Sequence, residues 1–369
     1  MSDLSIILCT CNARARLQPT LEHLAAQRVP PQITWDLILV DNNSTDGTAD
    51  FARELWSTLS TVPLQVLHEP TQGVAHARAR GLAAARSALL GMVDDDNWLD
   101  AEWISTAVAV MEAHPDAGAC GGFNTAHYEI DPPAWLPAVA GALAVGGQGD
   151  AAGDVTDSRG LLWGAGLVLR RTALEQATAL GIPYALSGRV GTSLTSGEDS
   201  EMCLLLRLAG WRLRYDPRLR LTHAIGAQRL TWQYLRRLSH GAGAASPLLD
   251  GYYVALRHDG PWRAVDRLRW SWPWQAARAA QAAWRHPMTR ITAWAGAGVG
   301  STTVLECEAA RGRFATLMQL RGAYSRRIQQ VLAALRAQAQ GGVPRRPAAT
   351  LAHAVSPRAG TAGGATHAS

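Results

Sequence analysis

The chain has 369 residues, of which 47% are hydrophobic and 18% are charged, a composition that excludes a wholly disordered protein. All 35 basic Lys and Arg side chains are arginine, and the net charge of +5 favours anionic partners such as nucleotides or anionic lipids; no nucleic-acid partner is expected. The five cysteines form no disulfide pattern, the N-terminus has no signal-peptide pattern, and no apolar stretch is long enough to span a membrane.

The first half of the chain alternates between apolar runs and amphipathic segments. Strands are expected at residues 4–9, 33–40, 64–67, 88–93 and 118–123, and helices at residues 13–28, 45–59, 74–86 and 100–113. Strands that are almost continuously apolar and alternate with helices are typical of a parallel sheet with helices on both faces. The sequence therefore predicts an α/β, Rossmann-like fold, in which ligands bind at the carboxyl ends of the strands.

The second half of the chain changes character after a long loop. The expected elements are a loop at 132–159, a strand at 161–169, a helix at 171–180, a mobile loop at 188–197, a helix at 198–208, and short strands at 211–215 and 219–222. Helices are expected from residue 232, and a Pro-, Ala- and Gly-rich tail begins at residue 341. The predicted domains are residues 1–230, a helical extension at 231–338 and a disordered tail at 339–369.

Polar side chains follow each of the first four predicted strands. Thr10 and Asn12 follow the first strand, Asp41 and Asn43 the second, and a Gly-containing loop that leads to Arg78 follows the third. The fourth strand ends in three consecutive aspartates. Because the carboxyl ends of parallel strands meet at one edge of the sheet, these clusters are expected to converge there.

The three aspartates after the fourth strand are Asp94, Asp95 and Asp96. Adjacent carboxylates repel one another, and a hard divalent cation such as Mn²⁺ or Mg²⁺ would remove that repulsion and bind a phosphate. The alternative is a solvated acidic turn that precedes a helix. Convergence with the other strand-end clusters favours the metal site.

The strand-end residues Asp41, Asn43 and Arg78 each have a structural alternative. Asp41 can accept a nucleobase N–H and Asn43 can bind the same ligand, but the Asp-Asn-Asn-Ser-Thr-Asp-Gly run also suits a turn with a helix N-cap. Arg78 lies near a helix start, where anions are favoured, although a solvated helix face would also explain it.

Two further candidates lie downstream. Glu198 and Asp199 open a predicted helix, and a carboxylate there could act as a general base; the alternative is a capping box between Ser196 and Asp199. His223 ends a short predicted strand and could complete a metal site with the aspartates, although a single histidine is more often structural.

The helical extension is rich in tryptophan and arginine. Residues 232–294 contain seven of the 14 Trp, and residues 262–330 contain eleven Arg against three acidic residues. Amphipathic helices of this composition suit a membrane interface with anionic lipid, and equally a helical cap in which the Trp side chains form the core.

Six motifs occur in order along the first two thirds of the chain. They are SIILCTCN at 5–12, LVDNNSTDGT at 39–48, GVAHARARGL at 73–82, MVDDDN at 92–97, WGAG at 163–166 and GEDSE at 197–201. Together they resemble the motifs of family 2 glycosyltransferases of the GT-A fold, over about residues 3–235. The departures from the family pattern are modest, namely Cys9, Cys11 and Ala79, and none removes a carboxylate that the chemistry needs.

The resemblance implies a role for each matching residue. The expected nucleotide-sugar ligands are Thr10, Asn12, Asp41, Asn43, Arg78, Asp94 and Asp95, with Trp163 and Gly164 beside the acceptor. Asp96, Asp94 and His223 would bind Mn²⁺ or Mg²⁺. Asp199 would be the catalytic base, with Glu198 adjacent to it.

The resemblance also implies an activity. The expected enzyme is an inverting glycosyltransferase that uses a nucleotide-diphosphate sugar and a glycan or lipid-linked acceptor in polysaccharide or glycan biosynthesis. It would be cytoplasmic, with a peripheral contact to the inner face of the membrane. The alternatives are a nucleotidyltransferase, whose Gly-rich basic loop is missing after the first strand, and a non-catalytic nucleotide-sugar-binding subunit, which would not need both Asp96 and Asp199.

Overall fold

The computed structural model describes residues 2–186, 197–257, 264–284 and 299–340. The expected mobile loop at 188–197, apart from Gly197, and the tail from residue 341 lie outside the described residues. The strands are β1 (Leu4–Thr10), β2 (Trp35–Asp41), β3 (Leu64–His68), β4 (Leu89–Asp94), β5 (Asn97–Leu99), β6 (Ala117–Tyr128), β7 (Gly153–Asp154), β8 (Leu167–Arg170) and β9 (Arg212–Ile225).

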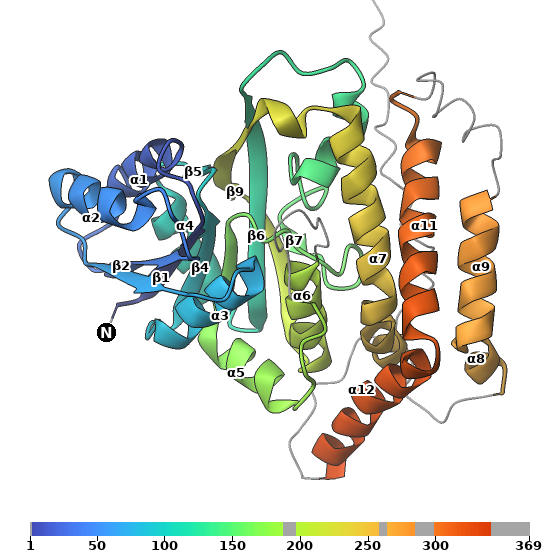
Figure 1. The fold of residues 1–369 in the computed structure, drawn as a ribbon. Helices are drawn as coiled ribbons and strands as arrows, with labels where there is room; N and C mark the ends of the chain where they lie inside the picture. Colours follow the sequence, from blue (N-terminus) through green and yellow to red (C-terminus); the bar gives the residue numbers. More distant parts are fainter. Residues whose placement is uncertain (1, 187–196, 258–263, 285–298, 341–369) are drawn as a thin grey trace, which may run out of the picture.

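Helices cover the sheet and form the C-terminal region (Figure 1). The helices of the first 230 residues are α1 (Leu17–Ala25), α2 (Thr48–Leu59), α3 (Val74–Ala84), α4 (Trp103–Ala113), α5 (Arg171–Ala179) and α6 (Glu198–Leu208), with 3₁₀ helices η1 (Leu136–Leu143) and η2 (Ala227–Arg229). The C-terminal helices are α7 (Trp232–Arg257), α8 (Ala264–Arg269), α9 (Trp272–Trp284), α11 (Thr302–Leu320) and α12 (Gly322–Gln340).

The strands form one mostly parallel sheet in the order β3-β2-β1-β4-β8-β6-β9-β5, with β7 paired to β9. Strands β1 to β4 are parallel, as are β6 and β9, whereas β8, β5 and β7 run antiparallel to their neighbours. The predicted α/β class, with a helical C-terminal region, is therefore confirmed. The pairing of β1 with β4 places Cys9 opposite Asp94, so the loop after β1 lies beside the three aspartates.

Alternate side chains of the strands enter two buried clusters, one on each face of the sheet. In β1, Ile6 and Leu8 pack with α1, α2 and α4, whereas Ile7 and Cys9 pack on the face covered by α3, α5 and α6. This period of two follows from the pleat of a strand and explains why the strand sequences are apolar throughout. The second cluster also contains residues of α7 and α12, so the predicted units 1–230 and 231–338 share one core.

Two strand predictions differ from the structure for backbone reasons. The strand expected at 161–169 is confined to β8, because Gly166 has a φ of +67°, a left-handed conformation that ends the strand. The two short strands expected at 211–215 and 219–222 are one strand, β9. Its register against β6 shifts between Gly121 and Phe123, and this irregularity accommodates Pro217, which has no N–H for a regular ladder.

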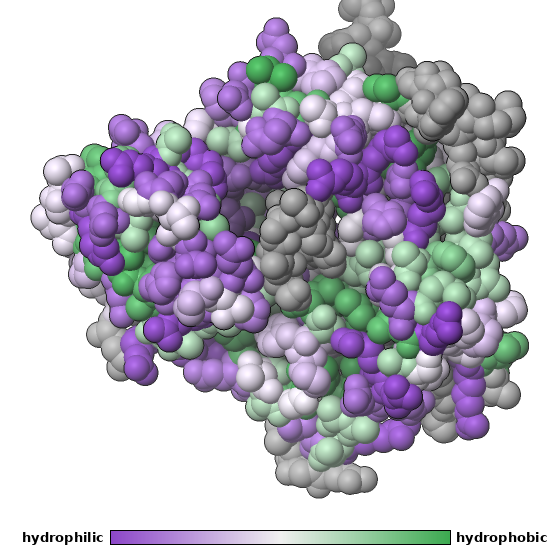
Figure 2. Space-filling view, in the orientation of Figure 1, coloured by the Kyte–Doolittle hydropathy of each residue, from purple (hydrophilic) through white to green (hydrophobic). Residues whose placement is uncertain are grey.

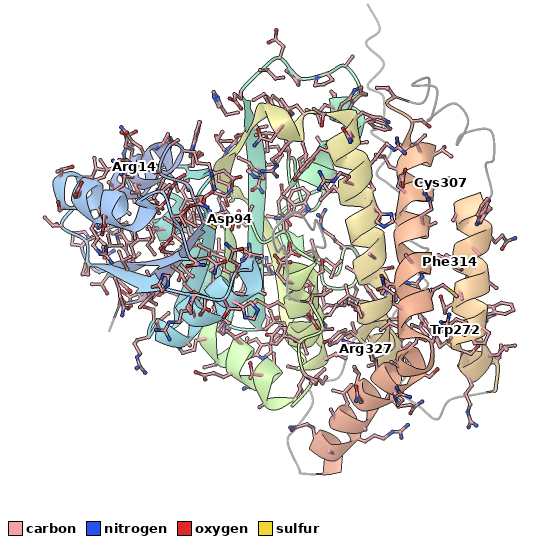
Figure 3. All side chains as sticks on the ribbon, in the orientation of Figure 1. Arg14, Asp94, Trp272, Cys307, Phe314 and Arg327 are labelled. Atoms are coloured by element: carbon pink, nitrogen blue, oxygen red, sulfur yellow. The ribbon has the colours of Figure 1, made fainter. Side chains whose placement is uncertain are left out.

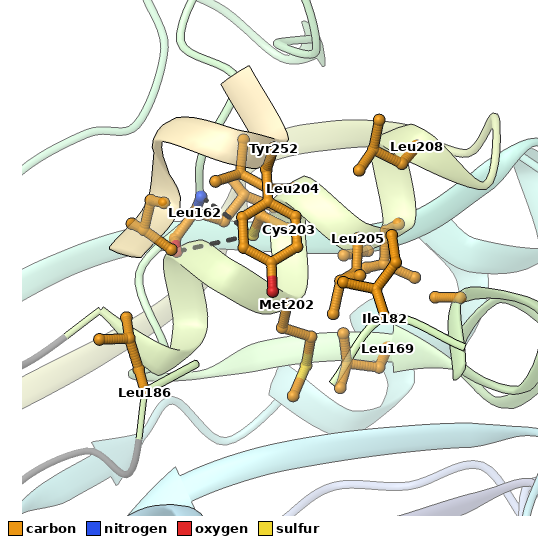
Figure 4. Close-up of a cluster of buried hydrophobic side chains, with 14 of the residues drawn as sticks. Leu162, Leu169, Ile182, Leu186, Met202, Cys203, Leu204, Leu205, Leu208 and Tyr252 are labelled. Atoms are coloured by element: carbon orange, nitrogen blue, oxygen red, sulfur yellow. Dashed lines mark hydrogen bonds between the residues drawn. The ribbon is translucent and has the colours of Figure 1, made fainter. Parts of the chain in front are cut away.

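Helix α6 is held in the core by contacts on two sides. Figure 4 shows Cys203 beside Leu162, whose N–H lies 3.4 Å from the Cys203 Sγ. Glu201, two residues before Cys203, accepts hydrogen bonds from the N–H groups of Ala185 (2.6 Å) and Leu186 (3.0 Å) and from the hydroxyl of Tyr252 on α7. These contacts fix the N-terminal turn of α6 relative to the sheet and to the helical extension.

The helical extension packs closely because glycines lie where its helices meet. A Cβ on Gly243 of α7 would lie 1.9 Å from the Ala309 carbonyl oxygen, and one on Gly312 of α11 would lie 2.0 Å from that of His240. Helix α9 lies on the far side of α11, as Figure 1 shows, and Trp272 donates its Nε1–H to the Leu317 carbonyl at 2.5 Å. None of the described helices is long and apolar enough to cross a membrane.

The β6–β9 pairing predicts a glycine-specific cost. A Cβ on Gly122 would lie 1.7 Å from the Leu219 carbonyl oxygen, so Gly122→Ala must displace backbone at the strand irregularity. We expect the free energy of unfolding to fall by about 1–3 kcal/mol or more, measured by urea denaturation. Gly153→Ala is the matched control, because a Cβ there meets no atom within 4 Å. Equal effects of the two substitutions would contradict the packing described here.

Candidate active site

A cleft of about 1610 Å³ opens at the carboxyl ends of β1 and β4. The ends of β1 and β4 form the floor of this cleft, and residues of α3, α6, β9, η2 and α7 form its walls. Figure 3 labels Asp94 near the middle of the molecule, and Figure 2 shows hydrophilic residues over the neighbouring surface of the sheet domain. The cleft lining includes eleven of the thirteen predicted site residues, namely Thr10, Asn12, Arg78, Asp94, Asp95, Asp96, Trp163, Gly164, Glu198, Asp199 and His223.

Arg78 joins the aspartates to the N-terminus of α6. Its Nη2 donates to Asp94 Oδ1 at 3.1 Å and its Nη1 donates to Glu198 Oε1 at 2.9 Å. Burial disfavours a charged Arg78, but the two carboxylates outweigh burial and raise its pKa. The alternative of a solvated helix face is therefore wrong, because the side chain is only 9% exposed. Its expected role beside the nucleotide stays a prediction.

Asp199 is oriented by backbone donors. The N–H of Gly164 donates to its Oδ2 at 2.9 Å, and the N–H of Ser200 donates to its Oδ1 at 2.7 Å. Burial and the neighbouring Glu198 raise the pKa of Asp199, and Arg78 opposes that shift. Helix α6 begins after Gly197, which has no side chain to cap it, and Ser196 of the capping-box alternative lies outside the described residues. A carboxylate with a raised pKa in a cleft suits proton abstraction.

Asp95 is engaged by the loop after β1. Arg16 donates to both of its carboxylate oxygens, from Nε and Nη2 at 2.9 Å each, and the Thr10 hydroxyl donates to Oδ2 at 2.8 Å. Burial raises the pKa of Asp95, and the Arg16 hydrogen bonds oppose that shift. Thr10 and Asp95, both predicted to bind the donor, therefore bind each other in this structure, and their contact with a nucleotide stays a prediction.

Asp96 lies beside His223, because β5 pairs with β9 and sets Asn97 opposite His223. Asp96 Oδ2 is 3.4 Å from His223 Nε2 and 3.0 Å from Arg229 Nη1. Burial opposes ionisation of Asp96, but His223 and Arg229 outweigh burial and lower its pKa to about 2. The structure thus brings two of the three predicted metal ligands together and ties the third, Asp94, to Arg78.

The side chains near Asp96 could supply some, but not all, of the ligands of a divalent cation. Within the described ranges, no group of three or more His, Cys, Asp or Glu side chains is arranged to hold a metal ion. Asp96 and His223 supply one carboxylate oxygen and one imidazole nitrogen, and Mg²⁺-type sites are commonly completed by substrate phosphates and water. The pair therefore fits a cation that is bound together with a phosphate-bearing ligand.

Asp41 and Asn43 lie beyond the cleft lining, although Asn12 is part of it. Asn12 Oδ1 accepts the N–H of Thr45 at 2.9 Å, which joins the loops that follow β1 and β2. Asp41 is buried and accepts the N–H of Ser44 at 3.3 Å. These contacts match the turn that the sequence offered as an alternative for this cluster, and base recognition by Asp41 and Asn43 stays a prediction.

Trp163 and Gly164 form the wall beside Asp199. Gln148 accepts the N–H of Trp163 at 2.7 Å, and the Arg159 guanidinium lies 4.6 Å from the Trp163 ring centre. A Cβ on Gly164 would lie 3.1 Å from Arg78 Nη2, so this position leaves little room beside the carboxylates. The expected place of both residues beside the acceptor stays a prediction.

Sequence reasoning missed two of the arginines in the cleft. Arg16 follows β1 and Arg229 lies in η2, and each pairs with one aspartate of the triplet. The available signal was charge balance, because three adjacent carboxylates require nearby cations whether or not a metal is bound. The positions of those cations depend on contacts 79 and 133 residues apart in the chain.

Comparison with known proteins identifies the fold and the activity class. The model of the glycosyl transferase family 2 matches residues 5–176, which excludes Asp199, His223 and Arg229. The chain is 22% identical over 260 residues to a glucosyl-dolichyl phosphate glucuronosyltransferase of Haloferax volcanii, covering 69% of this chain and 80% of that protein. It is 30% identical over 110 residues to a dodecaprenyl-phosphate galacturonate synthase of Rhizobium johnstonii, covering 30% of this chain and 32% of that protein.

Two solved structures share the fold. A mannosyltransferase from Pyrobaculum calidifontis in complex with GDP-Man and Mn²⁺ has a TM-score of 0.50 and 19% identity, covering 91% of this chain and 86% of that one. S. aureus TarS in complex with UDP-GlcNAc has a TM-score of 0.51 and 15% identity, covering 92% of both chains. Residues 5–176 match the glycosyl transferase family 2 model, and the chain has the GT-A fold; together with the curated relatives, this match supports a glycosyltransferase.

Proposed function

We propose that this glycosyltransferase transfers a sugar, with inversion, from a nucleotide-diphosphate donor to a hydroxyl acceptor, using Asp199 as the base. The observation that carries the proposal is the orientation of Asp199 by Gly164 and Ser200 in the cleft that also contains the three aspartates. A base and a phosphate-binding cluster in one cleft are what a direct displacement at the anomeric carbon requires.

The proton and bond changes balance in one displacement. Asp199 takes the proton of the acceptor hydroxyl as that oxygen forms a bond to the anomeric carbon. The bond from the anomeric carbon to the diphosphate breaks, and the nucleoside diphosphate leaves with the electron pair. Because a single attack occurs from the face opposite the leaving group, the configuration at the anomeric carbon inverts.

Glu198 and Arg78 are positioning residues in this scheme. Glu198 raises the proton affinity of Asp199 through its negative charge, and Arg78 limits that rise. Because Arg78 also binds Asp94, it couples the base on α6 to the donor side of the cleft. Asp96 and His223 would hold Mn²⁺ or Mg²⁺, whose charge would stabilise the leaving diphosphate.

The names of the two relatives support a lipid-linked substrate. One acts on a glucosyl-dolichyl phosphate and the other makes a dodecaprenyl-phosphate galacturonate. We infer that the acceptor here is a sugar hydroxyl of a glycan attached to a polyprenyl-phosphate. Such an acceptor is embedded in a membrane, so the enzyme would work at a membrane surface.

Helices α8 and α9 offer a surface for that contact. The described chain has eight exposed large hydrophobic residues, and five of them lie between residues 265 and 299. Leu268 is 57% exposed and Trp274 is 41% exposed, and Arg269 and Arg278 of the same helices are also exposed. Tryptophan and arginine on one exposed helical face suit an interface with anionic lipid.

The base assignment predicts the effect of Asp199→Asn. Loss of the proton acceptor should lower kcat by about 10²–10⁴-fold, while the affinity for the nucleotide product, measured by calorimetry, stays unchanged. Glu175→Gln, which removes an exposed carboxylate on α5, is the control and should keep full activity. Transfer that survives in Asp199→Asn would mean that another group is the base.

The charge coupling predicts a pH effect of Arg78→Gln. Asp199 works as a base only when ionised, so kcat falls as the pH drops through its raised pKa. Removing Arg78 removes a positive charge that lowers this pKa, so the acid limb of the kcat profile should move to higher pH. Arg80→Gln removes an exposed arginine of the same helix and should leave the limb in place. An acid limb unmoved in Arg78→Gln would contradict the coupling.

The membrane contact predicts binding to anionic vesicles. The protein should co-sediment with vesicles containing phosphatidylglycerol, and binding should fall with added salt and with pure phosphatidylcholine. The double variant Leu268→Glu, Trp274→Glu should lose this binding. Ile130→Glu, at another exposed apolar residue, should retain it. Equal losses in both variants would argue against the α8–α9 surface.

A further inference from the structure

The three aspartates are each neutralised by a different arginine. Arg78 pairs with Asp94, Arg16 pairs with Asp95 and Arg229 pairs with Asp96. The repulsion among the carboxylates is therefore relieved by guanidinium groups in the ligand-free protein. A divalent cation that enters the site therefore meets carboxylates that are already paired with positive charges.

The three arginines differ in the number of hydrogen bonds that hold each guanidinium in place. Arg78 uses two nitrogens on two carboxylates, and Arg16 contacts both oxygens of Asp95. Arg229 makes its contact through Nη1 alone, and its buried Nε has no hydrogen-bond partner in the part of the chain that the structure describes. Arg229 is thus the arginine whose displacement breaks the fewest hydrogen bonds.

Arg229 Nη1 lies beside both side chains that are placed to bind a cation and forms the third corner of a triangle with their nearest atoms. It lies 3.0 Å from Asp96 Oδ2 and 3.2 Å from His223 Nε2, and these two atoms are 3.4 Å apart. A Mg²⁺-type ion binds its ligands at about 2.0–2.1 Å, so an ion that bridges Asp96 and His223 on the side where Nη1 lies would overlap this nitrogen. At that position the guanidinium and the metal ion exclude each other.

The location of Arg229 allows it to move. It is the last residue of the short helix η2, which begins after Gly226, and its side chain lines the same cleft as Asp199. A guanidinium released from Asp96 stays within the cleft that receives the donor. Arginine binds phosphate oxygens through a two-pronged contact, so a diphosphate provides a new partner for it.

We propose that Arg229 is an internal counter-cation that holds the divalent-cation position until the nucleotide-sugar arrives. This inference rests on the proposed function, because it assumes a donor with a diphosphate and a cation. Its consequence is an ordered site: the metal ion binds weakly to the protein alone, because it must displace Arg229 without offering that side chain a new partner.

The test is a titration of the nucleotide-free protein with Mn²⁺ alone, with free Mn²⁺ measured by electron paramagnetic resonance. Arg229→Gln should bind Mn²⁺ at least tenfold more tightly than the unmodified protein. Arg16→Gln is the matched control, because it removes one positive charge from the same aspartate cluster without emptying the position that Arg229 Nη1 occupies beside Asp96 and His223. It should change the affinity much less.

Three outcomes would overturn the proposal. They are unchanged Mn²⁺ affinity in Arg229→Gln, an equal gain in Arg16→Gln, and tight Mn²⁺ binding by the unmodified protein, a result that needs no variant to fold. Circular dichroism checks that the variants are folded, and Arg229→Met provides a second substitution. A separate donor screen for nucleotide release tests the proposed function, so a gain in Mn²⁺ affinity without transfer would contradict the function and not the role of Arg229.

Discussion

The structure of the cleft depends on one electrostatic constraint, the confinement of five carboxylates at one edge of the sheet. Asp94, Asp95 and Asp96 follow β4, and Glu198 and Asp199 begin α6. Like charges at this density would destabilise the fold unless cations are placed among them. Arg16, Arg78 and Arg229 supply those cations and also determine what each carboxylate can do.

The division of roles follows from these pairings. Asp95 is held on both oxygens, so it joins the loop after β1 to the end of β4. Backbone donors orient Asp199, whereas burial and the charge of Glu198 raise its pKa. Asp96 and His223 both contact the guanidinium of Arg229. Identical side chains therefore differ in function because their nearest partners differ.

Much of the fold could be predicted from local sequence, and the reasons are physical. Apolar runs of strand length alternate with amphipathic helices, and each parallel strand ends in polar residues that a sheet edge can expose to a ligand. The sequence predicts two short strands in place of β9, because Pro217 interrupts the local strand pattern. In the structure, the irregular pairing between β6 and β9 accommodates this proline within one strand. The helices from residue 232 were predicted, but their close approach at Gly243 and Gly312 depends on tertiary contacts.

The composition of the candidate site was more predictable than its connections. Carboxylates after a strand and at a helix start are visible in the sequence, and eleven of the thirteen predicted residues line the cleft. The pairing of Arg229 with Asp96 joins residues 133 apart, and that of Arg78 with Glu198 joins residues 120 apart. No local pattern specifies such pairs, so the sequence suggested a metal ion where the folded chain provides a guanidinium.

The central claim, a single displacement assisted by one base, is tested most directly by the configuration of the released sugar. The first sugar released by slow hydrolysis of an accepted α-linked nucleotide-sugar can be identified by proton nuclear magnetic resonance before the anomers equilibrate. Attack of water in place of the acceptor, with Asp199 as the base, predicts the β-anomer. Release of the α-anomer would contradict the account, because retention requires a second displacement or a different base.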